Sequence, residues 1–143
     1  ARVTDPLAAI TAACRILDVS RIGFISPYVA DVSVHLRDRL NAVGCEIAAF
    51  GSFEEGNDRV VARITEEAIA AATASIAARA ECDALVISCT NLRCLRIIPQ
   101  IEDHLGIPVI SSNQALAWHM LRLAGVEDAL PQFGRLFRLG LTA

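Results

Sequence analysis

The chain has 143 residues, of which 54% are hydrophobic, and its formal net charge is −3 at pH 7. All 13 basic residues are arginines, which excludes a Schiff-base lysine, a pyridoxal anchor and the lysine of a P-loop. The arginines are scattered and no apolar stretch is long enough to span a bilayer, so we expect neither a nucleic-acid nor a membrane partner.

A helix is predicted at the start of the chain, because Thr4 or Asp5 can cap it and Pro6 suits its first turn. Apolar residues then recur at helical spacing to about Leu17. Further along, the predicted strands cover residues 21–26, 45–50, 84–88 and 107–110. The predicted helices cover 31–43, 58–79, a segment from Asn91 that is broken or restarted at Pro99 and ends near Gly106, and 113–123.

Strands that alternate with helices of this length predict an α/β fold, a flavodoxin-like three-layer sandwich. Its four-stranded parallel sheet is expected in the order 2-1-3-4. We predict a single α/β lobe over residues 1–143, with a leading helix at 1–18, a sheet core at 19–112, and a crossover helix and tail at 113–143. In such sheets, ligands bind where the winding direction reverses, here between the carboxyl ends of the first and third strands.

Those two strand ends carry Ser26-Pro27-Tyr28 and Ser88-Cys89-Thr90-Asn91. The second strand delivers the polar loop 51–57 to the same edge of the sheet, and the fourth strand delivers residues 111–113. Small hydroxyl and amide side chains around one thiol predict a site for a small anion. The turn after the first strand lacks the Gly-containing hydroxyl loop of a flavodoxin, so no flavin is expected.

Cys89 is the candidate reactive residue, because a thiol at a strand-to-helix corner lies near the helix's free N–H groups, which favour the thiolate. The alternative is a buried cysteine that acts as a small hydrophobic residue. Tyr28 is either a ligand contact or a loop cover. Asn57 is either a ligand contact or only a helix N-cap.

The five cysteines are odd in number and form no Cys-x-x-Cys pair, so they predict neither a disulfide framework nor a zinc site. Free thiols favour a reducing compartment, and we expect the cytoplasm. The high apolar content predicts a sizeable interface with a partner, since monomers rarely expose large apolar patches. We expect a homo-oligomer.

Several runs together resemble a known family. From about Thr4 to Gly125 the chain resembles the cofactor-independent aspartate/glutamate racemase superfamily, in its branch of maleate cis-trans isomerases, arylmalonate decarboxylases and ectoine-utilisation proteins. The residues that carry the resemblance are Ile25-Ser26-Pro27-Tyr28, Asn57, Ser88-Cys89-Thr90-Asn91-Leu92-Arg93, and the run from Pro108 to Trp118.

The resemblance implies two similar lobes that hold the substrate between them, each contributing one cysteine or its replacement. This chain resembles the second lobe, so a missing first lobe or another subunit is an expected partner. By the same resemblance Cys89 is the catalytic thiol, no metal or cofactor is used, and the substrate is a small carboxylate. The implied substrate-binding residues are Tyr28, Asn57, Thr90, Asn91, Ser26 and Pro27.

The expected activity is that of a cofactor-independent isomerase or racemase, in which Cys89 gives or takes a proton at the carbon next to the carboxylate. The alternatives are an arylmalonate-type decarboxylase and a non-catalytic carboxylate-binding or assembly domain. Cys14 lies in a predicted helix and Cys45 begins a strand, so the first-lobe cysteine has no counterpart here. We therefore expect this chain alone to be inactive, with helix 113–123 and tail 130–141 packed against the missing part.

Overall fold

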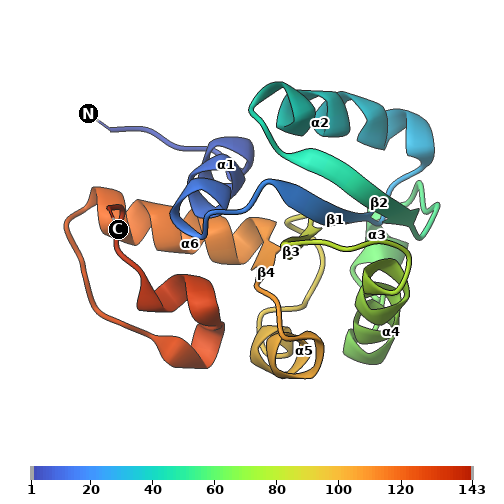
Figure 1. The fold of residues 1–143 in the computed structure, drawn as a ribbon. Coiled ribbons are helices and arrows are strands. Elements are labelled where there is room, and N and C mark those ends of the chain that lie inside the picture. Colours follow the sequence, from blue (N-terminus) through green and yellow to red (C-terminus); the bar gives the residue numbers. More distant parts are fainter. Residues whose placement is uncertain (1, 143) are drawn as a thin grey trace.

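Four parallel strands form one sheet at the centre of the computed structural model, which describes residues 2–142 (Figure 1). The strands lie in the order β2-β1-β3-β4, which confirms the predicted topology. Their bounds are β1 Arg21–Ser26, β2 Glu46–Ser52, β3 Ala84–Ile87 and β4 Val109–Ser111. The predicted and observed strands agree within two residues at each end, since each is a short apolar segment that ends at small polar residues.

Helices cover both faces of the sheet (Figure 1). One face carries α1 (Pro6–Ile16), α2 (Ala30–Ala42) and α6 (Ser112–Leu123), and the other carries α4 (Glu66–Ala77) and α5 (Ile98–Leu105). None of the helices within residues 2–142 has the length and hydrophobicity that crossing a bilayer requires. The three layers therefore match the predicted sandwich.

An apolar core lies on each face of the sheet. Each strand contributes to both cores, because successive side chains point to opposite faces. On β3, Val86 packs with α1 and α6, whereas Leu85 and Ile87 pack with α4 and α5. All three side chains are fully buried. A continuous apolar run is thus what a strand covered on both sides requires.

The predicted long helix over 58–79 is wrong, because the chain forms two helices there. A short α3 (Asp58–Val61) is followed by a turn, and α4 begins after Thr65, whose Oγ1 accepts a hydrogen bond from the Ala68 N–H at 3.2 Å. Glu66 and Glu67 then occupy the first turn of α4, where negative charge is favourable. A capping threonine followed by two acidic residues is the sequence signal for this second start.

The predicted helix start at Asn91 is wrong, since residues 91–97 form turns and the first helical residue is Ile98; the predicted restart at Pro99 and the end near Gly106 are confirmed. Pro99 lies in the first turn of α5, where it lacks only an N–H that would be unpaired. A helix running through it would bring the proline ring against the carbonyl of residue 95. The segment nevertheless buries Leu92 and Cys94 in the core. The apolar residues of this segment are therefore explained by a loop that packs on the core, and not by a helix.

The C-terminal segment packs on its own lobe, which corrects the expectation that helix 113–123 and tail 130–141 lie against a missing partner. Figure 1 shows this segment, in red, folded back beside α6 and α5. Trp118 and Leu136 are fully buried and Phe137 is 3% exposed within this one chain. Two short 3₁₀ helices, Pro131–Phe133 and Arg135–Arg138, form the returning segment. Part of the apolar surplus is therefore internal.

Arg122 fixes the returning segment by polar contacts. Its guanidinium, on a residue only 2% exposed, donates to the carbonyls of Leu139 at 2.9 Å, Val126 at 2.7 Å, Asp128 at 3.0 Å and Phe137 at 3.4 Å. A buried carbonyl without a hydrogen-bond donor destabilises the fold. The irregular tail leaves several carbonyls without a backbone donor, and the Arg122 guanidinium supplies donors for them.

We expect Arg122→Met to lower the free energy of unfolding by about 2–4 kcal/mol, because several buried carbonyls lose their donor at once. Urea denaturation measures this change. Arg63→Met is the matched control: that side chain is exposed, and its removal should change stability by no more than about 0.5 kcal/mol. Equal effects of the two substitutions would show that Arg122 does not fix the tail.

Candidate active site

Tyr28 is positioned by the loops that follow β1 and β2. Its backbone N–H donates to Ser26 Oγ at 3.2 Å, and that same buried Oγ accepts a hydrogen bond from Ser33 Oγ at 2.9 Å. On the other side, Ser52 Oγ donates to the Tyr28 carbonyl. The backbone of Tyr28 is therefore fixed on both sides, and its ring projects from a braced turn.

The two loops run beside each other past the end of the strands. Phe53 N–H donates to the Ser26 carbonyl at 3.1 Å, and Glu55 N–H donates to the Pro27 carbonyl at 2.8 Å. These bonds continue the β1–β2 pairing beyond the sheet and bring the start of α3 to Tyr28.

Cys89 lies directly after β3 and contacts Tyr28, as predicted from the strand order. Its thiol donates to Tyr28 Oη at 3.3 Å, and its sulfur accepts a hydrogen bond from the Asn91 N–H at 3.2 Å. The residue is 6% exposed. The thiol thus has one acceptor and one donor at the carboxyl edge of the sheet.

Asp58 closes a ring of hydrogen bonds around this thiol. Tyr28 Oη donates to Asp58 Oδ1 at 3.3 Å, and Asn91 Nδ2 donates to the Asp58 backbone carbonyl at 2.6 Å. The ring therefore runs through Cys89, Tyr28, Asp58 and Asn91, which come from three different loops. Each member restricts the geometry of the next.

The Tyr28 phenol stays protonated at neutral pH in this arrangement. The hydrogen bond with Cys89, then partial burial, and then the nearby negative charges raise the pKa of Tyr28 above its ordinary value. A neutral phenol has one proton to donate, and in this structure Asp58 accepts it.

The expected helix N-terminus at Cys89 is absent, because α5 begins only at Ile98. The helix-dipole argument for a thiolate at Cys89 therefore does not apply, and the local donor to its sulfur is the Asn91 amide. Burial is the main cause that raises the pKa of Cys14 and Cys82, and it raises the pKa of Cys94 to about 11. These three thiols are poor candidates for acid/base work near neutral pH.

The other predicted residues lie on the same edge in different roles. Asn57 is exposed and caps α3, with Oδ1 accepting from the Arg59 N–H at 2.9 Å. Ser26 is buried beneath Tyr28, and Pro27 is buried in the same turn. Thr90 is exposed at the site, and its carbonyl accepts from Asn113 Nδ2 at 2.8 Å.

Sequence analysis missed Asp58 and the contact made by Asn113. Asp58 stands at the first position of α3, where an acidic residue is ordinarily explained by the helix dipole. Only the pairing of two loops brings its carboxylate to Tyr28, and no sequence spacing signals that contact. The strand order predicts the correct edge for Asn113, but its bond to the Thr90 carbonyl depends on the non-helical conformation of residues 91–97.

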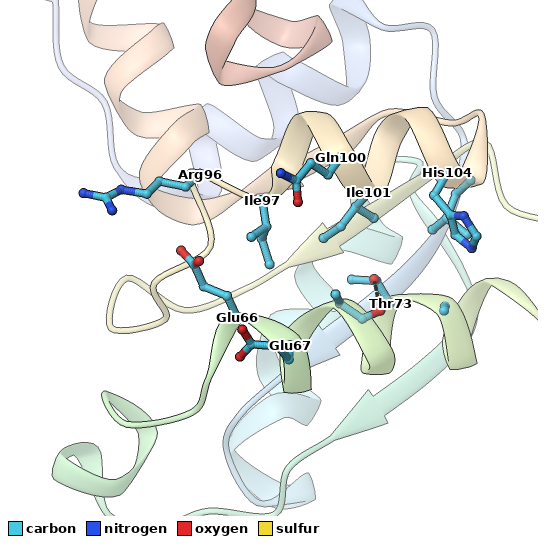
Figure 2. Close-up of a pocket in the computed structure, with 11 residues that line it drawn as sticks. Glu66, Glu67, Thr73, Arg96, Ile97, Gln100, Ile101 and His104 are labelled. Carbon is cyan, nitrogen blue, oxygen red and sulfur yellow. Dashed lines mark hydrogen bonds between the residues drawn. The ribbon is translucent and has the colours of Figure 1, made fainter.

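Two hollows of the surface are candidates for a ligand site. The larger, of about 910 Å³, adjoins the Cys89 loop and is lined by Thr90 and Asn91 together with Arg63, Arg93 and Arg96. A hollow of about 350 Å³ separates α4 from α5, and Figure 2 shows Ile97 and Ile101 pointing across it toward α4.

The hollow between α4 and α5 is lined by none of the ring residues, so the candidate site is the carboxyl edge and not this hollow. Within residues 2–142, no group of three or more His, Cys, Asp and Glu side chains is arranged to hold a metal ion.

We expect limiting iodoacetamide at pH 8 to alkylate Cys89 before Cys14, Cys82 and Cys94, because burial raises the pKa of those three thiols. Peptide mapping by mass spectrometry measures the order of labelling. Cys82 is the stringent comparison, since it is partly exposed. First labelling at any of the three would contradict the assignment of Cys89 as the reactive thiol.

Two known enzymes are similar to this chain in sequence. The maleate isomerase of Nocardia farcinica is 32% identical over 139 residues, a match that covers 96% of this chain and 55% of that enzyme. The arylmalonate decarboxylase of Bordetella bronchiseptica is 32% identical over 141 residues, covering 94% of this chain and 57% of that enzyme. The chain therefore spans little more than half the length of these relatives.

Solved structures show the same fold. The Nocardia farcinica maleate cis-trans isomerase bound to TRIS superposes with a TM-score of 0.90 at 31% identity, covering 95% of this chain and 55% of that one. A mutant of the same enzyme, with a covalently bound succinylcysteine intermediate, has a TM-score of 0.87 at 30% identity, covering 93% and 54%. The family model described as arylmalonate decarboxylase matches residues 3–137, and the chain therefore belongs to that family.

Proposed function

We propose that Cys89 is the acid/base thiol of a cofactor-independent enzyme that isomerises a small carboxylate. The observation that carries the proposal is the contact of its thiol with Tyr28 Oη at the carboxyl edge of the sheet. The succinylcysteine intermediate in the Nocardia farcinica relative supports it, because it shows that this fold supports cysteine chemistry on a four-carbon carboxylate.

The proposed reaction uses two thiols. The thiolate of a cysteine outside this chain adds to the alkene of the substrate, and Cys89 donates its S–H proton to the adjacent carbon and becomes a thiolate. Rotation about the new single bond follows. Cys89 then takes a proton back as the carbon–sulfur bond breaks, which restores the alkene in the other configuration. The backbone N–H of Thr90 stabilises the charge that develops on the carboxylate oxygens, while the Asn91 N–H, which donates to the Cys89 sulfur at 3.2 Å, stabilises the thiolate that forms when Cys89 gives up its proton.

A decarboxylase is the second candidate, because the matching family model and the Bordetella bronchiseptica relative both carry that description. In this version the substrate loses carbon dioxide, and Cys89 protonates the resulting enediolate carbon. Both versions use the same half-site on this chain. The identity of the group outside the chain distinguishes them.

We also propose that a second body, either another lobe of the same protein or another subunit, covers this edge. Large hydrophobic residues in the segments around the site are 36–56% exposed, and these are Val29, Val32, Val60 and Leu95. We call these four residues, which lie in the segments that follow β1, β2 and β3, the apolar rim. The rim supports a closed, water-poor site once the second body is in place.

The full-length protein should turn over maleate or an arylmalonate, and Cys89→Ala should reduce kcat by at least about 1000-fold, because the proton donor is lost. Product formation followed by chromatography measures both activities. Cys82→Ala is the control: that thiol lies at the opposite edge of the sheet, beside Asp83, and its loss should leave kcat within about twofold. Full activity of the Cys89→Ala protein would disprove the proposal.

Residues 1–143 expressed alone should show no turnover of these substrates, since they supply one of two acid/base groups. The exposed rim should also cause self-association, which light scattering detects. A monomer that turns over any of these substrates would show that no second body is needed.

A further inference from the structure

We propose that a hollow between α1 and α2 is a second ligand site, which binds a small carboxylate with an apolar body. The hollow has a volume of about 360 Å³, within the ordinary range of small-molecule sites. It lies on the face of the sheet that carries α1, α2 and α6, and none of the ring residues around Cys89 lines it. The site is therefore separate from the proposed reaction site.

Two buried serines without hydrogen-bond partners line this hollow. Ser88 is 5% exposed and Ser112 is 3% exposed, and neither hydroxyl makes a hydrogen bond to any of residues 2–142. The other buried serines, Ser26, Ser33 and Ser111, all make side-chain hydrogen bonds. Buried polar groups are almost always paired, so two exceptions in one hollow indicate a polar group of a ligand.

Both hydroxyls are positioned by well-fixed backbone. Ser88 directly follows β3, and its N–H donates to a β1 carbonyl at 2.8 Å. Ser112 is the first residue of α6, whose start is fixed by a capping box between Ser111 and Gln114. Among the side chains that the structure describes, the one fully enclosed polar atom without a partner is Arg37 Nε. The two serine hydroxyls are therefore open to the hollow.

The walls of the hollow are apolar. Leu7 and Ile10 of α1 and Leu36 of α2 line it. Ile10 is fully buried, and the two leucines are half-buried. Apolar walls around a few polar groups are typical of a small-molecule site, in which the walls contact the hydrocarbon part of the ligand.

The charges around the hollow favour an anion. His35 and Arg39 lie one helical turn apart on α2, and neither forms an ion pair in the described part of the chain. The acidic residue that lines the hollow, Asp5, already accepts a hydrogen bond from the Ala8 N–H at 2.9 Å. Because Ser112 begins α6, the positive end of that helix dipole also lies at the hollow. A carboxylate can accept hydrogen bonds from both serine hydroxyls there.

The probe is hexanoate, and its neutral amide, hexanamide, is the comparison. We expect hexanoate to bind the full-length protein with a Kd of about 0.1–1 mM, an ordinary affinity for a ligand of this size. Hexanamide should bind about three- to tenfold more weakly, because hydrogen bonds to a charged acceptor are stronger. Calorimetry measures both affinities. Nuclear Overhauser effects from hexanoate to the methyl groups of Leu7, Ile10 and Leu36 locate the ligand.

Substitution of either serine tests the assigned contacts. Ser88→Ala and Ser112→Ala should each raise the Kd for hexanoate by about three- to tenfold, because each removes one hydrogen bond to the carboxylate. Ser75→Ala is the matched control: it removes an exposed hydroxyl from α4, on the other face of the sheet, and should leave the Kd within about 1.5-fold. Arg39→Gln should weaken binding of hexanoate more than binding of hexanamide.

The Cys89→Ala protein should bind hexanoate with an unchanged Kd, so the result does not depend on the proposed reaction. No binding of hexanoate would overturn the proposal and would show that water or another protein segment pairs with the two hydroxyls. A Kd that neither Ser88→Ala nor Ser112→Ala changes would also overturn it. So would ligand contacts to the Leu95 methyl groups in place of the wall residues, since these would place the ligand at the Cys89 loop.

Discussion

Parallel pairing of β1 with β3 is the constraint on which the site depends. Ile25 lies opposite Ile87, and the Ser88 N–H donates to the Ile25 carbonyl at 2.8 Å, so both strands leave the sheet at the same level. The phenol of Tyr28 and the thiol of Cys89 then meet at 3.3 Å although 61 residues separate them in the sequence. A sheet in sequential order would place β2 between them and separate the two groups.

The sequence predicted the elements whose patterns are local. Alternating strands and helices gave the order of the sheet, and the strand ends identified Tyr28 and Cys89 as neighbours. The failures occur where loops decide the structure. Leu92 and Cys94 are buried in turns, although the spacing of apolar residues in this segment is also typical of a helix. Asp58 contacts Tyr28 only because the loops after β1 and β2 are hydrogen-bonded to each other.

The C-terminal segment shows why composition cannot locate an interface. A high hydrophobic fraction predicts that many apolar side chains are buried, but it does not distinguish burial within the lobe from burial against a partner. Here the tail returns to its own lobe, where Trp118 donates its indole N–H to the Leu139 carbonyl at 2.9 Å and Arg122 satisfies further carbonyls. Part of the apolar surface that remains exposed lies at Val29, Val60 and Leu95, in the segments that follow β1, β2 and β3. These residues are therefore on the same edge of the sheet as the candidate site.

The ring around Cys89 uses most of its own donors, so a substrate must displace one of its bonds. The Asn91 bond to the Asp58 carbonyl is short at 2.6 Å, and the contact of Asn91 with the sulfur comes from the backbone. The Tyr28–Asp58 contact, at 3.3 Å, is much longer than the ~2.7–2.8 Å typical of O–H···O bonds. The S–H···O contact of Cys89 with Tyr28 is also weak, because a thiol is a poor donor. A ligand therefore displaces the contacts of the Tyr28 hydroxyl more readily than the Asn91 bond, while the loops that position this hydroxyl stay in place.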